Sequence, residues 1–299
     1  METPLSVIIT TYNRKTLLKR CLDSVKNQKY SNYQIIVVDD HSEPSYENEI
    51  ISEYPDIKYI VQEENGGPGI ARNTGILIAD NNYVILMDDD DVFKEEAFTK
   101  INSFIQTSFD NSFPVFNFLI SNARVEKICD YHIYSFKELI EGKLQGDLLH
   151  VINKKSFLEV NDYKFPNYKI GAESLLWYKI ALDYGLPVVN EVLVNLGEDA
   201  KDRLTNIDRQ VNSSLEFASF QLSIIKNYQS HLLTSGNKNF LIKKYQGAIM
   251  YLLLSGQKLK AIYYWIKLFK YTYKHILLLF LFILPKKSII QLLKIYRKV

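Results

Sequence analysis

Short apolar runs and amphipathic stretches alternate along the first 100 residues of the chain. Runs rich in β-branched residues, typical of buried strands, lie at 5–10, 34–38, 57–61 and 83–87. The stretches between them, at 16–28, 46–54 and 70–79, are expected to be helical. Strands that alternate with helices over short connections predict an α/β fold with a mostly parallel central sheet and right-handed crossovers.

The pattern becomes less regular after residue 94. It predicts helices at 94–107 and 172–184, and strands at 114–125, 148–153 and 188–196. From residue 207 onward every long segment has helical periodicity. We therefore predict two domains, an α/β domain at 1–205 and an all-α C-terminal region at 206–299.

The charge of the chain is divided unevenly between these two parts. The last acidic residue is Glu216, and 14 Lys and Arg follow it. The rest of the chain holds 22 basic against 34 acidic residues, so an acidic body carries a basic tail. Such asymmetry indicates a polyanionic partner, either nucleic acid or membrane. Two cysteines and a polar N-terminus without a signal-peptide pattern favour a reducing, cytoplasmic setting.

The basic tail has an amphipathic pattern. One helical stripe of residues 258–274 is apolar, and lysines occupy another; the stripe comprises Leu259, Ile262, Tyr263, Ile266, Phe269 and Tyr273. The apolar run 276–284 is too short to span a bilayer of about 30 Å. This pattern predicts helices that lie on an anionic membrane surface, peripheral to the inner face of the cell membrane. A helical cap, or a contact in a homo-oligomer, is the alternative. No nucleic acid partner is expected, because the aromatic residues alternate with aliphatic ones.

Tyr83–Asp91 is the most informative stretch of the chain. Its apolar run ends in four consecutive carboxylates, which must emerge where the predicted strand ends. A divalent cation such as Mg²⁺ or Mn²⁺ would relieve their repulsion. The alternative is a solvated acidic turn.

Four motifs in order resemble the family-2 glycosyltransferases, most of which are inverting enzymes with the GT-A fold. They are Ser6–Arg14, Ile36–Ser42, Asn65–Gly75 and Leu86–Asp91. The resemblance covers the first 100 residues and, more weakly, residues 145–195. It implies a GT-A nucleotide-sugar-binding fold at 1–205 and an enzyme of the bacterial polysaccharide or capsule type.

The resemblance also implies roles for individual side chains. The first two strand ends would hold a nucleobase and ribose, since a carboxylate can accept a uracil N–H and a tyrosine ring can pack on the base. The implied nucleotide-sugar ligands are Thr10, Tyr12, Asn13, Asp39, Asp40, Arg72, Asp88 and Asp89. Two alternatives stay open: Tyr12 as a loop aromatic over a sheet edge, and Asp39 and Asp40 as caps of the following turn.

The acid run matches the Asp-x-Asp motif of that family. This match implies Asp90 as the ligand of Mn²⁺ or Mg²⁺, which would stabilise charge on the leaving diphosphate. Asp91 is alternatively a helix cap.

The resemblance implies that the catalytic base is an acidic residue just before the helix that carries Trp177. Glu173 holds that position. The usual Glu-Asp pair is replaced by Ala172-Glu173, and a first-turn Glu that stabilises the helix is the alternative. The donor-sugar or acceptor pocket would include Asp147, His150, Trp177 and Arg203.

Together these implications describe a hexosyltransferase that moves a sugar from a nucleoside-diphosphate donor, most simply UDP-linked, to a polysaccharide or lipid-linked oligosaccharide. A sugar nucleotidyltransferase is disfavoured, because Thr11–Arg14 lacks the glycine-rich phosphate loop that such enzymes place after the first strand. A non-catalytic membrane scaffold that binds nucleotide-sugar is the other alternative. The acids are intact at all three acidic sites, Asp39–Asp40, Asp88–Asp91 and Glu173, which argues against a scaffold.

Overall fold

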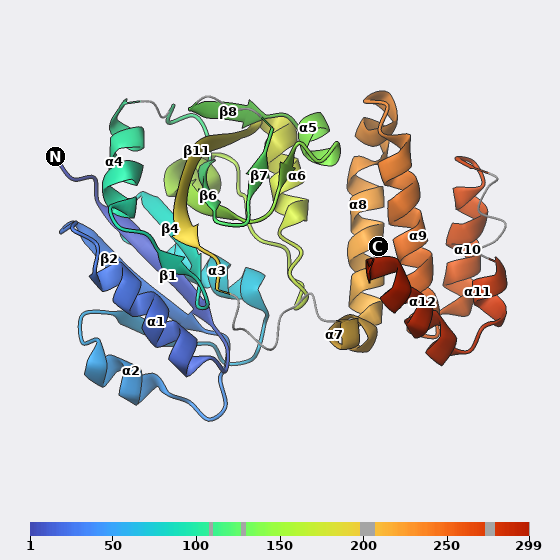
Figure 1. The fold of residues 1–299 in the computed structure, drawn as a ribbon, viewed down its shortest axis with the longest axis horizontal. Coiled ribbons are helices and arrows are strands. Elements are labelled where there is room, and N and C mark those ends of the chain that lie inside the picture. Colours follow the sequence, from blue (N-terminus) through green and yellow to red (C-terminus); the bar gives the residue numbers. More distant parts are fainter. Residues whose placement is uncertain (108–109, 127–129, 198–206, 273–278, 299) are drawn as a thin grey trace. The chain divides into compact units, whose positions relative to one another are not determined.

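The structure is a computed structural model that describes residues 1–107, 110–126, 130–197, 207–272 and 279–298. The chain divides into two compact units, Met1–Lys201 and Asp202–Val299. Each unit is described by itself (Figure 1). The domain boundary predicted at 205/206 lies outside the described residues and stays a prediction.

Unit 1 begins with the predicted alternation of strands and helices. Its first elements are β1 (Leu5–Thr11), α1 (Lys15–Lys26), β2 (Tyr33–Asp39), α2 (Glu47–Glu53), β3 (Lys58–Val61), α3 (Pro68–Ile78) and β4 (Tyr83–Asp88). Strands β3, β2, β1 and β4 are neighbours in that order and pair in parallel. This half of the sheet confirms the α/β prediction.

The rest of unit 1 completes the sheet with a less regular chain path. Its elements are β5 (Val92–Phe93), α4 (Ala97–Thr107), β6 (Val115–Ile120), β7 (Arg124–Val125), β8 (Tyr131–Tyr134), α5 (Phe136–Ile140), β9 (Leu144–Gln145), β10 (Leu148–Asn153), a π-helix at Lys155–Val160, α6 (Ser174–Asp183) and β11 (Leu186–Asn195). Strand β10 lies between β4 and β6 and is antiparallel to both. Strand β11 pairs in parallel with β6, and β5 and β8 pair antiparallel with β11. The short strands β5, β8 and β9 were not predicted, and the strand predicted at 114–125 is divided into β6 and β7.

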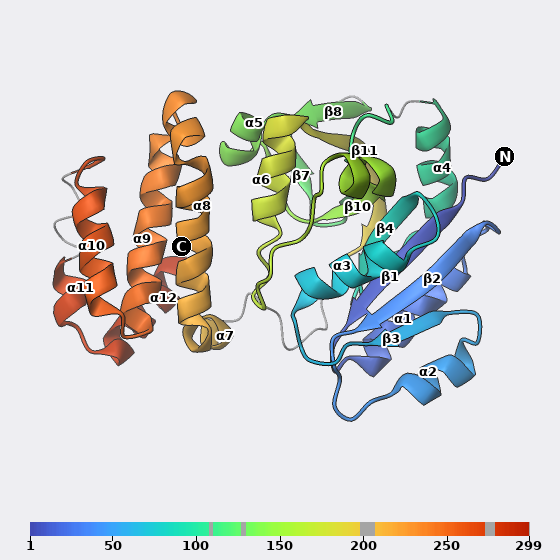
Figure 2. The ribbon, with the colours of Figure 1, turned by 180° about the vertical axis from the view of Figure 1, so that it is seen from behind.

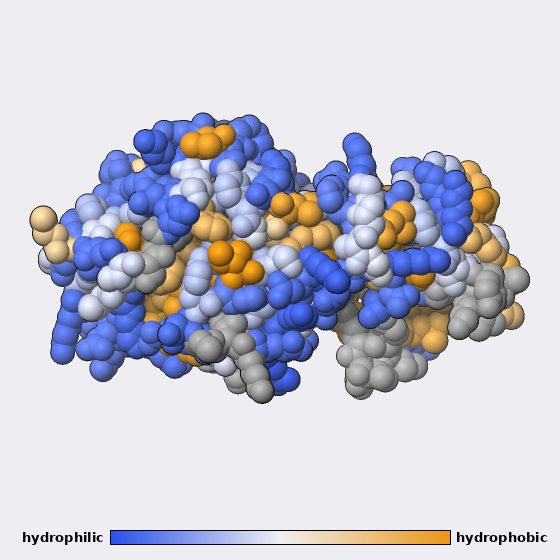
Figure 3. Space-filling model, turned by 90° about the horizontal axis from the view of Figure 1, so that it is seen from above, coloured by the Kyte–Doolittle hydropathy of each residue, from blue (hydrophilic) through white to orange (hydrophobic). Residues whose placement is uncertain are grey.

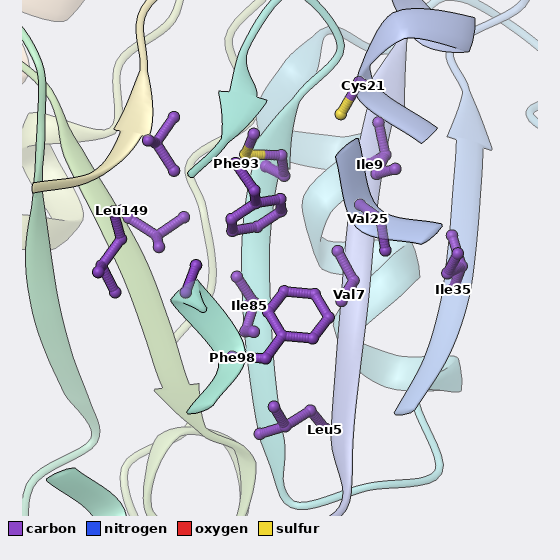
Figure 4. Close-up of a cluster of buried hydrophobic side chains, with 14 of the residues drawn as sticks. Leu5, Val7, Ile9, Cys21, Val25, Ile35, Ile85, Phe93, Phe98 and Leu149 are labelled. Atoms are coloured by element: carbon purple, nitrogen blue, oxygen red, sulfur yellow. The ribbon is translucent and has the colours of Figure 1, made fainter. Parts of the chain in front are cut away.

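Helices cover both faces of this sheet. Figure 1 shows α1 and α4 on one face, and Figure 2 shows α3 on the other. Every residue of β1 is buried. This is expected because successive side chains point to opposite faces of the sheet, and helices cover both faces. Leu5, Val7 and Ile9 belong to the core beneath α1 and α4, where Phe98 of α4 is fully buried (Figure 4).

Glycines let α3 start and pack close to the sheet. Gly67 precedes the helix with φ 86°, and a Cβ there would lie 2.7 Å from the Cα of Lys169. A Cβ on Gly75 would lie 2.5 Å from Ile8 of β1. Other residues would therefore strain the turn or push the helix off the sheet.

Unit 2 is helical over its described residues, as predicted. Its helices are α7 (Ile207–Asn212), α8 (Ser214–Thr234), α9 (Lys238–Leu254), α10 (Lys258–Leu268), α11 (Leu279–Ile283) and α12 (Lys286–Lys298). Helices α8 and α9 end at left-handed glycines, Gly236 and Gly256, in matching Ser-Gly-x-Lys turns. In each turn the residue after glycine donates its N–H to the carbonyl five residues back, which closes the helix end. Among the described helices, none combines the length and apolar character needed to cross a membrane.

Candidate active site

The candidate site lies at the carboxyl ends of the parallel strands. Thr10 of β1 is level with Asp88 of β4, and Thr11 is level with Asp39 of β2. The side chains predicted from separate motifs therefore meet at one edge of the sheet, where open α/β sheets bind ligands. Thr10 is buried there, whereas Tyr12 in the following loop is 41% exposed.

Asp39 and Asp40 have different surroundings. Asp39 is fully buried, and its two oxygens accept hydrogen bonds from the Ser42 N–H and the Tyr59 hydroxyl, both at 2.8 Å. The Asp40 carboxylate accepts the backbone N–H groups of Gly66 and Gly67 at 2.8 Å. The Asp39 bond to Ser42 has the geometry of the turn cap that the sequence left as an alternative. Burial raises the pKa of Asp40, and the two N–H bonds oppose that shift.

Asn13 links the first loop to the segment after β2. Its backbone N–H donates to the Ser42 hydroxyl at 2.8 Å, and its side-chain oxygen accepts the Glu43 N–H at 2.8 Å. Its φ of 55° is a left-handed conformation that asparagine tolerates better than most residues. These bonds order the loop that carries Tyr12.

Asp89 lies beneath the other acids of the run. It is 2% exposed and accepts hydrogen bonds from the Thr11 hydroxyl at 2.8 Å and the Arg14 guanidinium at 3.1 Å. Arg14 also lies 3.7 Å from Asp90. Burial raises the pKa of Asp89 to about 7 although Arg14 opposes the shift. Asp89 thus ties β4 to the first loop.

Asp88, Asp90 and Asp91 form the candidate metal site. One carboxylate oxygen from each lies within 4.8 Å of the others. Asp91 also accepts the Gly197 N–H at 2.9 Å, and its pKa is raised to about 7, first by burial and then by Asp88 and Asp90. A cation near these oxygens would remove that repulsion, and three carboxylates fit the donor set of Mg²⁺ or Mn²⁺.

Arg72 connects this acid cluster to the predicted base. Its guanidinium donates to Asp88 and to Glu173, each at 2.6 Å, and lies over the Phe165 ring at 5.5 Å. Burial would lower the pKa of Arg72, but the two carboxylates raise it. Glu173 itself is the N-cap of α6, with 27% of its side chain exposed. The Arg72 guanidinium therefore positions two carboxylates that lie 85 residues apart in the sequence.

His150 is held against Trp177 of α6. The two rings stack at 4.0 Å, and His150 Nδ1 lies 2.6 Å from the Asn117 side-chain oxygen. The Asn117 amide donates to the Pro187 carbonyl, so its oxygen must face the histidine and accept. His150 Nδ1 therefore carries the proton, and Nε2 is an acceptor that has no partner among the described residues. Burial, with Arg72, lowers the pKa of His150 to about 3.

Two other predicted pocket residues have different outcomes. Asp147 is exposed and exchanges two hydrogen bonds with Asn122, at 2.7 and 3.1 Å. The charge of Asp147 contributes to the raised pKa of Asp91, which lies nearby. Arg203 lies outside the described residues.

The sequence reasoning gave no role to Arg14, Asn117 or Phe165. Arg14 belongs to the motif Ser6–Arg14, but its partner Asp89 lies 75 residues away, so no local pattern marked the contact. Asn117 is a lone amide inside an otherwise apolar strand, which indicates a buried hydrogen bond. No comparable signal marked Phe165.

Comparison with known proteins agrees with this geometry. The family model "Glycosyl transferase family 2" matches residues 6–140. The GalNAc(5)-diNAcBac-PP-undecaprenol beta-1,3-glucosyltransferase of Campylobacter jejuni is 31% identical over 191 residues, which cover 59% of each protein. The putative glycosyltransferase EpsH of Bacillus subtilis is 28% identical over 181 residues, or 56% of this chain. The chain spans 52% of the length of EpsH.

A solved structure shares the fold. The crystal structure of S. aureus TarS 1-349 in complex with UDP-GlcNAc superposes with a TM-score of 0.58 and 18% identity, covering 89% of this chain and 90% of that one. The sheet, the acid cluster and the family match thus lead to one assignment. Over residues 6–140 the chain matches the family-2 glycosyltransferases, and its fold is the GT-A fold of the TarS structure.

Proposed function

We propose that this chain transfers a sugar from a UDP-sugar to a polysaccharide or lipid-linked oligosaccharide, with inversion at the anomeric carbon. The observation that carries the proposal is the Arg72 link, which holds Glu173 beside the acid cluster at bonds of 2.6 Å. A base and a diphosphate site must be adjacent in a direct displacement. The UDP donor is supported by the UDP-GlcNAc complex of TarS, and the acceptor class by the name of the C. jejuni relative.

The donor nucleoside would lie along the ends of β1 and β2. The exposed Tyr12 ring can pack on a base, with Thr10 and Asn13 beside it. Gly66 and Gly67 fix the Asp40 carboxylate, so its position does not depend on the ligand. Asp39 and Asp89 would act from beneath, by holding these loops in place.

Asp90, with Asp88 and Asp91, would hold Mn²⁺ or Mg²⁺. A bound divalent cation supplies electrostatic stabilisation of the charge that develops on the departing diphosphate. Arg72 can add a second positive charge on that side through its planar fork.

The transfer itself needs one proton acceptor. Glu173 takes the proton of the acceptor hydroxyl as that oxygen forms its bond to the anomeric carbon, and the bond from that carbon to UDP breaks. Oε1 of Glu173 is bonded to Arg72, and Oε2 has no partner among the described residues, so Oε2 is the atom assigned to the proton. His150 Nε2 and the Trp177 ring would contact a sugar.

A panel of sugar nucleotides tests this function. UDP release should depend on one donor, on acceptor and on Mn²⁺ or Mg²⁺, and EDTA should abolish it. Glu173→Gln should lower kcat by about a hundredfold or more with a small change in KM, because a general base contributes about 10²–10⁴. Glu191→Gln, a distant surface change on β11, is the matched control. Release from no donor would favour a scaffold, and an active Glu173→Gln variant would exclude Glu173 as the base.

We also infer that unit 2 associates peripherally with an anionic membrane surface on the cytoplasmic side. The support is the basic, acid-free sequence after Glu216. A lipid-linked acceptor would be presented at that surface.

A further inference from the structure

Helix α10 has two apolar faces, and only one of them is packed. Ala261 and Leu268 are buried at 0% and 1% exposure on the side that meets the other helices of unit 2. On another side of the helix, Leu259 is 84% exposed, Ile266 58% and Tyr263 52%. The core of unit 2 explains the first face and leaves the second without a role.

The exposed stripe continues onto α11. Trp265 of α10 and Phe282 of α11 are in ring contact at 6.4 Å, which places the two helices side by side (Figure 1). We call the combined surface the α10–α11 face. Its exposed apolar residues are Leu259, Ile262, Tyr263, Ile266, Phe269, Leu279, Phe280 and Ile283. Hydrophobic residues gather at the edge of unit 2 that carries these helices (Figure 3). Tyr273, the last position of the predicted stripe, lies outside the described residues.

Positive charge borders this face. At 100° per residue, Lys258 lies on one side of the α10 stripe, and Lys260 and Lys267 lie on the other. Lys267 Nζ is 4.4 Å from the centre of the Tyr263 ring, so its stem runs along the apolar surface. No Asp or Glu follows Glu216 in the sequence, so no acid of that segment offsets these lysines.

We propose that the α10–α11 face inserts into the headgroup region of a bilayer that contains anionic phospholipid. An apolar stripe bordered by lysines matches both layers of such a surface, because the apolar side chains enter the acyl boundary while the ammonium groups stay among the phosphates. A water-soluble protein partner would have to match the exposed apolar residues and an excess of positive charge together. The inference deepens the membrane association proposed above and does not depend on sugar transfer.

Vesicle flotation of the whole chain tests the inference. The protein should float with vesicles of phosphatidylcholine plus phosphatidylglycerol, and its affinity should fall about tenfold or more on phosphatidylcholine alone or at high salt. Leu259→Ser/Ile266→Ser should weaken binding to the anionic vesicles by about tenfold or more, because two apolar side chains no longer leave water. Leu215→Ser/Leu233→Ser is the matched control, since both leucines are exposed on α8, at 49% and 40%.

Three results would overturn the inference. They are no flotation of the natural chain, equal flotation of the α10 variant and the natural chain, or a dimer in sedimentation that the α10 variant turns into a monomer. The last result would make the face a subunit contact. Circular dichroism confirms that each variant is folded. UDP release measured without vesicles reports on the transfer function separately, so either proposal can fail without the other.

Discussion

His150→Gln should remove a measurable part of the pH dependence of folding stability. Burial, with Arg72, lowers the pKa of His150 to about 3 in the folded protein. In an unfolded chain the pKa of histidine is about 6.5. Between these values the unfolded chain binds a proton that the folded protein does not. The folded protein therefore keeps this contribution above about pH 6.5 and loses it as the pH falls toward about 3.

The size of the effect follows from the distance between the assay pH and the unfolded-state pKa. At about pH 5.5, one unit below that pKa, the proton costs the folded protein about 1.4 kcal/mol relative to about pH 7.5. Glutamine binds no proton, so the free energy of unfolding of the variant should fall by about 1.4 kcal/mol less over the same interval. Loss of the stack on Trp177 lowers stability at both pH values, and its cost cancels from this difference.

Urea unfolding at the two pH values, followed by far-UV circular dichroism with EDTA present, measures this difference directly. The remaining histidines are common to both proteins and cancel. An equal pH dependence in the two proteins would contradict the lowered pKa of His150. It would mean that His150 is protonated in the folded protein, and Nε2 would then be a donor and not the acceptor that the Asn117 contact implies.

One further prediction concerns the Arg72 link between Asp88 and Glu173, and another concerns the hydrophobic core of unit 1. Arg72→Lys keeps the charge but lacks the fork that reaches Asp88 and Glu173 together, so UDP release should fall at least about tenfold; unchanged release would show that the double contact is dispensable. Phe98→Ala should lower the free energy of unfolding by about 3–5 kcal/mol in urea, because Phe98 is fully buried against Tyr30, Tyr33 and Phe93. Leu77→Ala, at a residue that is 64% exposed, should cost less than about 0.5 kcal/mol. Equal losses for the two substitutions would contradict the core assignment.

The first half of the sheet was predictable because its information is local. Each of β1, β2 and β4 is a short apolar run, and each connection is a helix with a readable apolar face. The position of β10 was not predictable. Its insertion between β4 and β6 pairs His150 with Leu86, 64 residues away, and no local pattern encodes such a partner. The same limit applies to the short strands, which exist only because β11 or a neighbouring strand pairs with them.

The sequence offers candidate site residues by type and position, but it does not indicate their hydrogen-bond partners. Adjacent acids such as Asp39 and Asp40 look alike in the sequence, and only the fold gives one to Ser42 and Tyr59 and the other to Gly66 and Gly67. The Arg72 link was invisible for the same reason. Arg72 was expected as a nucleotide-sugar ligand, and no pattern indicated that Asp88 and Glu173 would share it.

The four consecutive carboxylates have different surroundings in the fold although they are identical in the sequence. Successive residues at the end of a strand point to opposite faces, so Asp88 is exposed and Asp89 is buried. Burial of Asp89 requires partners, which Thr11 and Arg14 supply, and this anchors the end of β4 to the first loop. Asp88 faces Arg72 instead, and Asp91 turns back to Gly197. The acid run is thus tied to the first loop through Asp89 and to Glu173 through Asp88 and Arg72. A substitution at Asp89 should therefore disturb the loop after β1 first and the candidate metal site through it.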